Sequence, residues 1–315
     1  MRFNSLAILF ASFAAACANT GLGPVDLGEA QSEPIQISEA HETVFGITSN
    51  RKIKQGYVDT SEGQIHYWQA GQGPALLMIH QASSSSEEFA GVVDTLAGDF
   101  QVISFDWPGH GLSDDPDTEL GANGFTFSAL RVLDHLGVEK AHILGNHGGA
   151  LIAMNLAWKH PERVDRVILS GTSGVKDMDA VQEFSDDLGL DEMNVIDRDG
   201  RSLSDAWGRY TRYMPNSTPG EVLVAYMNNI TVRLRPYDAH YGVLRFDRRP
   251  ALQSMSETRV LLMQAEHDPF VSDQESLLQI LKNAERVVLE DVGVFNFFEN
   301  PAQSAEAIHA FLSKP

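Results

Sequence analysis

The chain contains 315 residues, of which 43% are hydrophobic and 21% are charged. This length and composition suit one large globular domain that buries a full core and has room for an insertion. The formal net charge of −20 makes nucleic acid and anionic membrane surfaces poor electrostatic partners, and its plainest consequence is solubility.

Residues 1–17 have the pattern of an export signal. Arg2 precedes an apolar stretch over residues 6–16, which is too short to span a bilayer as a helix. Cys17, the single cysteine, directly follows three alanines, as in a bacterial lipobox, where the cysteine is lipidated and becomes the mature N-terminus. An ordinary signal cleaved within this A-C-A stretch is the alternative. We therefore expect an exported protein of the bacterial periplasm or outer membrane, attached to the membrane, if at all, through Cys17.

Residues 18–50 are polar, are rich in Gly, Glu and Ser, and show no period. Such a composition is typical of a tether, which here would connect the signal region to a folded domain. With one cysteine in the chain, that domain has no intrachain disulfide.

From residue 56 the pattern becomes regular. Residues 56–71 alternate around a Ser61-Glu62-Gly63 turn, which predicts a β-hairpin. Apolar runs of strand length then alternate with stretches of helical spacing. The predicted strands are 75–80, 100–106, 141–145 and 164–171, and the predicted helices are 83–98, 124–138 and 149–161. This alternation predicts an α/β fold, with a mostly parallel sheet covered by helices on both faces.

Residues 175–255 break this rhythm, with helical pieces, many aromatic residues and a cluster of arginines. The alternation then returns. The remaining predicted elements are strands at 259–268 and 285–291 and helices at 273–283 and 301–312. We expect residues 175–255 to form a helical cap over a core built from 51–174 and 256–315. Ligands of open α/β sheets bind at the carboxyl ends of the strands, so such a cap would roof the binding site.

Five motifs fall after predicted strands. They are I-H-Q-A-S-S-S-S (79–86), D-W-P-G-H-G-L-S-D-D-P (106–116), G-N-H-G-G (145–149), E-H-D-P-F-V-S-D (266–273) and G-V-F-N-F-F-E-N-P (293–301). Their order and context over residues 56–313 resemble the capped branch of the α/β-hydrolase superfamily, which includes epoxide hydrolases, haloalkane dehalogenases and many esterases. The resemblance implies an α/β-hydrolase fold with a helical cap insertion.

The resemblance also assigns the three positions of the catalytic triad, and at two of them this chain has a different residue from the family. The family's G-x-S-x-G elbow carries a nucleophilic serine, but His147 stands there. The family's histidine follows the last strand in a G-H-x-P pattern, where this chain has Val294. Asp268 matches the family's acid. The standard Ser-His-Asp mechanism is therefore excluded, as is an aspartate nucleophile at the elbow.

The family's oxyanion hole is formed by two main-chain N–H groups. One follows the glycine of H-G-x-P, where Gln81 replaces that glycine and Ala82 carries the N–H. The other belongs to the residue after the elbow, which is Gly148. Because both donors are main-chain groups, the hole can survive the side-chain changes.

The two triad substitutions suggest one compensating arrangement. An imidazole at the elbow is larger than a serine hydroxyl and can cross the gap left by Val294 to reach Asp268. We expect a hydrogen-bonded His147–Asp268 dyad in which the carboxylate raises the His147 pKa. His147 would then act as a general base on water or on a carbon acid, and nucleophilic attack through an acyl-imidazole is a further alternative. The opposite interpretation is an inactive site that only binds a ligand.

Aromatic residues beside these motifs suggest an apolar or aromatic small-molecule substrate. The residues expected to contact it are Gln81, Trp107, Trp207, His240, Tyr241, Val294 and Phe295. Arg233 and Arg235 could receive a carboxylate. No histidine pair has metal-ligand spacing on one helix face and no glycine-rich phosphate loop follows the first parallel strand, so we expect neither metal nor nucleotide cofactor. The sequence thus favours cofactor-independent hydrolysis, or lyase-type acid/base chemistry, on a carbonyl compound, with an inactive binding protein as the alternative. It leaves the oligomeric state open.

Overall fold

The computed structural model describes residues 53–174, 196–237 and 239–314, which belong to one compact unit, Ile35–Pro315. The predicted export signal, Cys17 and the tether to residue 50 lie outside these residues, as do 175–195 of the predicted cap.

The described chain is organised around one eight-stranded sheet with the order β1-β2-β4-β3-β5-β6-β7-β8. Its strands are β1 (Lys54–Thr60), β2 (Gly63–Ala70), β3 (Ala75–Ile79), β4 (Gln101–Phe105), β5 (Ala141–Asn146), β6 (Val164–Ser170), β7 (Val260–Ala265) and β8 (Ala284–Leu289). Strands β3 to β8 run parallel, whereas the hairpin β1–β2 joins β4 in antiparallel orientation. The predicted hairpin and the predicted mostly parallel sheet are both confirmed.

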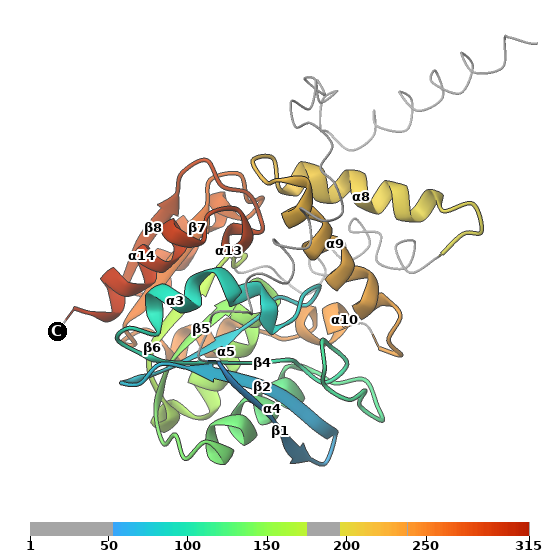
Figure 1. Ribbon diagram of the computed structural model, residues 1–315. Coiled ribbons are helices and arrows are strands. Elements are labelled where there is room, and N and C mark those ends of the chain that lie inside the picture. Colours follow the sequence, from blue (N-terminus) through green and yellow to red (C-terminus); the bar gives the residue numbers. More distant parts are fainter. Residues whose placement is uncertain (1–52, 175–195, 238, 315) are drawn as a thin grey trace, which may run out of the picture. The chain divides into compact units, whose positions relative to one another are not determined.

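Helices cover both faces of the sheet (Figure 1). On one face lie α4 (Ala122–His135), α5 (Gly148–Lys159), α11 (Arg249–Ser254) and α12 (Gln274–Ile280). On the other lie α3 (Val93–Leu96) and α14 (Pro301–Leu312). Each face buries its own apolar cluster, because continuous apolar strands such as Leu76–Ile79 present side chains to both sides. The carboxyl ends of the parallel strands are thereby fixed along a single edge.

The predicted helix at 83–98 differs from the structure. The chain instead forms a 3₁₀ helix, η2 (Ser86–Val92), followed by the single turn of α3. A 3₁₀ helix has three residues per turn, which places Ser86, Phe89 and Val92 on one buried face, and Glu88 is buried beside them. The segment is therefore helical over part of the predicted range, but with the tighter 3₁₀ turn at its start.

The cap range contains α8 (Arg201–Tyr213), α9 (Pro219–Arg233) and α10 (Ala239–Leu244). Helix α9 begins with a capping box, in which Thr218 and Glu221 bond each other's main-chain N–H. Helices α8 and α9 share an apolar cluster with Phe295 and Phe298, which follow β8. The cap is thus packed onto the short helix α13 (Asn296–Glu299), directly beside the position where the family carries its histidine.

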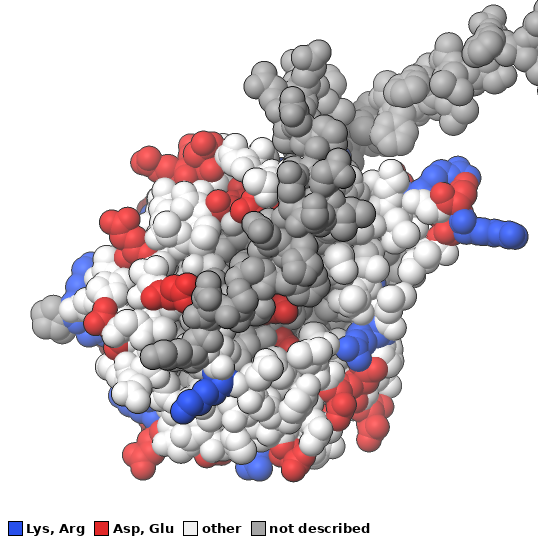
Figure 2. All heavy atoms as spheres, viewed as in Figure 1, with Lys and Arg blue, Asp and Glu red and all other residues white. Residues whose placement is uncertain are grey.

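Acidic side chains lie in several separate groups on the face shown in Figure 2, with fewer basic groups between them. Within the described part of the chain, no helix combines the length and the apolar character needed to cross a bilayer.

Candidate active site

Strand β5 turns sharply into α5 at His147, whose backbone has φ 46° and ψ −110°. Such a conformation costs about 1–3 kcal/mol in a non-glycine residue and persists only where the surroundings hold it. The flanking glycines are required by close packing. A Cβ on Gly145 would lie less than 3.0 Å from the Gly149 carbonyl, and one on Gly149 would be equally close to the Ile79 carbonyl. The G-N-H-G-G sequence therefore builds the elbow and aims the imidazole at the sheet edge.

The imidazole of His147 faces the carboxylate of Asp268. Nε2 lies 2.9 Å from Oδ2, and the two side chains are 14% and 1% exposed. The buried Nε2 is not aligned for a hydrogen bond to any acceptor, so the two groups are in close contact without the well-directed hydrogen bond expected, and they form an ion pair when His147 is protonated. The other carboxylate oxygen, Oδ1, accepts the N–H of Phe270 at 2.8 Å, which fixes the orientation of the carboxylate.

The charge state of His147 is set by opposing effects. Burial disfavours the imidazolium, but the negative charge of Asp268 and its contact with the ring outweigh burial, with smaller contributions from Glu88 and the main chain of Val294. Together they raise the pKa of His147 above its usual value. The neutral ring, which is the form able to accept a proton, therefore becomes dominant only at a higher pH than in a free histidine.

Val294 offers no side-chain acid or base at the position where the family has its histidine. Its N–H donates to the carbonyl of Tyr213, the last residue of α8, at 3.1 Å. The main chain at this position therefore ties the core to the cap and also contacts His147.

The main chains of Ala82 and Gly148 approach each other beside the elbow. A Cβ built on Gly148 would lie 3.3 Å from the Ala82 nitrogen and 3.3 Å from Cη2 of Trp107. Among the described residues, neither N–H donates to a protein acceptor. Gly148 is also the first residue of α5, where main-chain N–H groups point outward and favour negative charge. The structure thus brings both predicted donors together next to His147.

Two buried histidines hold the loop that carries Ala82. His80 contacts the Gln81 carbonyl through Nδ1 at 2.7 Å, and its Nε2 accepts the N–H of Trp107 at 3.1 Å. Burial lowers the pKa of His80 to about 3, which agrees with a neutral ring that both donates and accepts. His110 contacts the Ala82 carbonyl through Nε2 at 2.9 Å. The imidazoles of His80 and His110 therefore hold the main chain of the loop at Gln81 and Ala82 in place.

Glu88 was not anticipated as a site residue. It lies in η2, is 1% exposed, and bonds the residues that precede Ala82 and His147. In the sequence it stands within S-S-S-S-E-E-F, where acidic residues are typical of the first turn of a helix. The available signal was its spacing of four residues from Val92 and eight from Leu96, which places Glu88 on the buried side of the segment.

Residues 74–301 match the sequence family of the alpha/beta hydrolase fold. The chain belongs to this family. A solved enol-lactonase from Burkholderia xenovorans LB400 shares the fold, with a TM-score of 0.69 at 18% identity over 82% of this chain and 100% of that one.

Two relatives are similar in sequence over shorter stretches. An uncharacterised protein of Mycobacterium tuberculosis is 38% identical over 113 residues, which is 36% of this chain and 33% of that protein. A 2-hydroxy-6-oxo-6-phenylhexa-2,4-dienoate hydrolase of Comamonas testosteroni is 33% identical over 122 residues, which is 37% of this chain and 43% of that protein. The chain thus spans between a third and a half of the length of these relatives.

The other predicted contact residues of this α/β hydrolase differ in exposure. Gln81, Trp107 and Phe295 are buried, and Trp107 is stacked on His80 within the core. Trp207, His240, Tyr241 and Val294 are half-buried, and Trp207 packs against Tyr226 of the cap. Among these side chains the Gln81 amide is of interest, because its Nε2 is buried without a hydrogen-bond partner in the described structure.

The two arginines considered as carboxylate receptors are engaged with the protein. Arg235 forms an ion pair with Asp115 at 3.1 Å and donates to the Gly111 carbonyl. Arg233 donates to Asn229 at 2.6 Å. Over the described ranges, no group of three or more His, Cys, Asp or Glu side chains is arranged to hold a metal ion.

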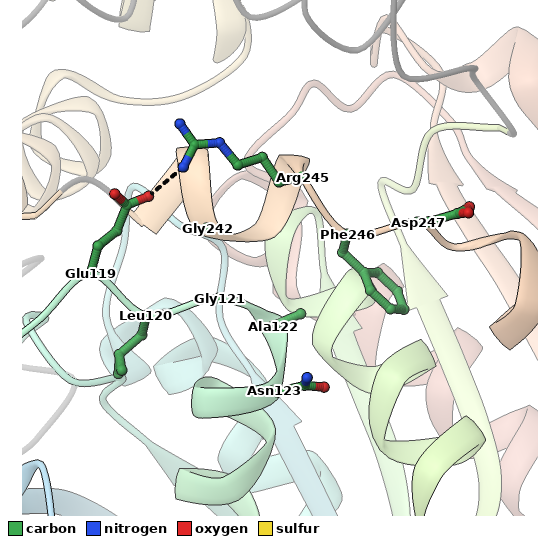
Figure 3. A pocket seen from close by; sticks show the side chains of 9 residues that line it. All are labelled: Glu119, Leu120, Gly121, Ala122, Asn123, Gly242, Arg245, Phe246 and Asp247. Carbon is green, nitrogen blue, oxygen red and sulfur yellow. Dashed lines mark hydrogen bonds and ion pairs between the residues drawn. The ribbon is translucent and has the colours of Figure 1, made fainter.

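A pocket of about 550 Å³ opens elsewhere on the hydrolase, between the start of α4 and helix α10 (Figure 3). Its lining residues are Glu119, Leu120, Gly121, Ala122, Asn123, Gly242, Arg245, Phe246 and Asp247. Arg245 closes one side through an ion pair with Glu119 at 3.0 Å. Because neither His147 nor Asp268 lines this pocket, it is separate from the chemical groups described above.

Proposed function

We propose that this α/β hydrolase cleaves a small apolar or aromatic carbonyl compound, using His147 as the general base and Asp268 as its partner. The observation that carries the proposal is the 2.9 Å contact between Nε2 and Oδ2 at an elbow flanked by two N–H groups without acceptors. The site offers a proton acceptor, a charge that stabilises the protonated acceptor, and donors for a developing oxyanion.

The proposed reaction begins with neutral His147. In this form Nε2 keeps its proton beside Asp268, and Nδ1 carries the lone pair that removes a proton from water. The resulting hydroxide adds to the carbonyl carbon, and the oxygen that becomes negative is held by the N–H groups of Ala82 and Gly148. The imidazolium then returns its proton to the leaving group as the bond to the carbonyl carbon breaks, which restores the neutral ring.

The substrate class rests on the aromatic residues around the site and on similarity to other proteins. The Comamonas testosteroni relative hydrolyses, by its name, a dienoate that carries a ketone and a phenyl group. The Burkholderia xenovorans structure is of an enol-lactonase. Both names describe carbonyl substrates, so aryl ketones, enol lactones and aryl esters are the first compounds to test. Lyase-type removal of a carbon-bound proton by the same base is the variant of this proposal.

A second candidate function is a ligand-binding protein that has lost turnover. One observation favours it: Nε2 of His147 is buried and faces Asp268, and the ring side chain is only 14% exposed. In that case the ion pair is a structural contact at the base of a binding site.

The test compares wild type with His147→Ala on a panel of aryl esters, enol lactones and vinylogous diketones. We expect kcat/KM to fall at least about 100-fold, the usual contribution of a general base. His267→Ala is the matched control, because His267 adjoins Asp268 in sequence but contacts the exposed Asp291. Equal turnover by wild type and His147→Ala would refute the assignment. Ligand binding without turnover by either would establish the second candidate.

We also propose that the protein is exported and lipid-anchored at Cys17, on the basis of the N-terminal sequence. Expression in a bacterial host with labelled palmitate should place label in the membrane fraction of wild type and not of Cys17→Ala. Unlabelled wild type in the soluble periplasmic fraction would favour ordinary signal cleavage.

A further inference from the structure

Glu88 is a fully buried carboxyl group that the proposed reaction does not use. It lies in η2 on the face covered by α3 and α14, and it is 1% exposed. A carboxylate without partners at such a depth is strongly disfavoured, so its hydrogen bonds indicate what retains it there.

Each oxygen of Glu88 binds a different segment of the site. Oε2 accepts the main-chain N–H of Gln81 at 3.0 Å, and Oε1 accepts a short hydrogen bond from the side-chain amide of Asn146. Gln81 directly precedes Ala82, and Asn146 directly precedes His147. One carboxyl group therefore joins the loop after β3 to the end of β5, the two segments that carry the oxyanion donors.

Glu88 also acts on the imidazole through its charge. Its carboxylate is one of the groups that raise the pKa of His147, after Asp268. In turn, burial raises the pKa of Glu88 to about 7, against the opposing effects of Gln81, Asn146, His147 and Ser84. The two groups therefore titrate in the same range and influence each other.

We infer that Glu88 is a positioning residue, which locks the Ala82 and His147 segments together and supplies a second negative charge that favours the imidazolium form of His147. This inference rests on the proposed function, because it concerns the base and the oxyanion donors of that reaction. Under this inference two carboxyl groups raise the pKa of His147. Asp268 contacts the ring directly, and Glu88 acts from η2, where it binds the N–H of Gln81.

The surroundings of η2 contain few other charges that could produce the same effect. Asp106, after β4, accepts the Ser86 N–H at 2.7 Å through Oδ1, and its Oδ2 contacts Nδ1 of His66 at 2.9 Å. Helices α13 and α14 meet η2 with Phe297 and Pro301. Among the described residues, His147 is thus the ionisable side chain whose charge acts on Glu88.

The test is an NMR titration of histidine ring resonances in the full-length protein, with Glu88→Gln compared with Glu87→Gln. Glu87 is the exposed neighbour of Glu88, so its replacement removes the same charge one residue away. The resonance of His147 is assigned by its loss in His147→Asn. We expect the His147 titration midpoint to move to lower pH in Glu88→Gln and to stay close to wild type in Glu87→Gln. An unchanged midpoint in Glu88→Gln, or an equal shift in both variants, would overturn the inference.

This readout does not depend on turnover. If His147→Ala retains activity while Glu88→Gln shifts the His147 midpoint, the proposed function fails and the electrostatic link stands. If Glu88→Gln does not fold, wild type provides the measurement. The amide resonances of Gln81 and of the Asn146 side chain should then move together with a midpoint near 7, the pKa of Glu88. Independent or absent titration of these two resonances would contradict a shared carboxyl partner.

Discussion

The imidazole of His147 lies directly against the α-carbon of Gly171, the residue after β6. A Cβ on Gly171 would come less than 3.0 Å from Nε2, Cδ2 and Cε1 of the ring, and Gly171 itself has φ 58°. A glycine here is therefore needed twice, for its left-handed backbone and for the space that the ring occupies. The space for the His147 ring thus depends on glycine at position 171, whereas the smaller side chain of a serine at the elbow would not need this space.

Gly171→Ala should therefore push the ring away from Asp268. We expect turnover to fall at least about 10-fold, because the base loses the partner that orients it. Gly137→Ala is a suitable control, since Gly137 has φ 68° and no atom within 4 Å of a built Cβ. Both variants place a Cβ on a left-handed residue, which costs about 1–2 kcal/mol and is measurable by thermal unfolding. Equal turnover of the two variants would show that the ring needs no clearance at Gly171.

The pH dependence of turnover follows from the raised pKa of His147. Because the neutral ring is the proposed base, activity should rise with pH, with its midpoint above the usual value of 6.5. Replacing Asp268 by Asn removes the charge that raises this pKa most. The rising limb of the pH–rate profile should then move to lower pH, while the plateau falls about 100-fold because the ring is no longer oriented. If the midpoint of the rising limb is the same in Asp268→Asn and in wild type, a group other than His147 controls the pH dependence of turnover.

Most residues of the candidate site could be predicted from the sequence because their positions depend on local patterns. The elbow glycines, the acid after β7 and the N–H of Ala82 each follow an apolar strand, and parallel strands bring their carboxyl ends to one edge. The roles of Gly171 and Glu88 could not be predicted in this way. Gly171 matters through contact with a ring 24 positions away, and Glu88 resembles an ordinary first-turn acid until η2 buries it.

The same reasoning explains where the secondary structure was misjudged. Residues 86–92 carry a helical signal that does not separate 3.6 from three residues per turn, and in the structure Phe89 packs against Phe297 with the rings 4.9 Å apart. Such a long-range contact leaves no trace in local spacing. Where the apolar stripe alone decides, as in α14, the predicted range of 301–312 is the observed one.

The burial of Glu88 also has a consequence for stability. A carboxyl group whose pKa is raised from 4.5 to about 7 binds a proton more readily in the folded than in the unfolded chain. Its contribution is therefore fully present below pH about 4.5 and is lost as the pH rises through about 7, by an amount of about 3 kcal/mol.

Glu88→Gln should flatten this dependence, when the free energy of unfolding is measured by urea titration between pH 4.5 and 7.5. Part of the slope will remain, because burial also raises the pKa of Glu299 to about 7. Glu87→Gln provides the comparison: Glu87 is more exposed than Glu88 but its pKa is also raised, by burial and by the charge of Asp106, so this variant should flatten the slope less. If the slopes of wild type and Glu88→Gln coincide, Glu88 is not the group whose ionisation costs stability.

The last prediction reverses the two triad substitutions. His147→Ser removes the ring from Asp268, and Val294→His places an imidazole on the segment that already contacts the elbow through its main chain. Because the proposed oxyanion donors, the N–H groups of Ala82 and Gly148, belong to the main chain, they remain in both variants. The double variant should react with a fluorophosphonate probe at the introduced serine, as an activated serine does, whereas either single variant should not. A double variant that folds but stays unlabelled would mean that the tie between Val294 and Tyr213 holds this segment in a geometry from which a histidine cannot bridge serine and Asp268.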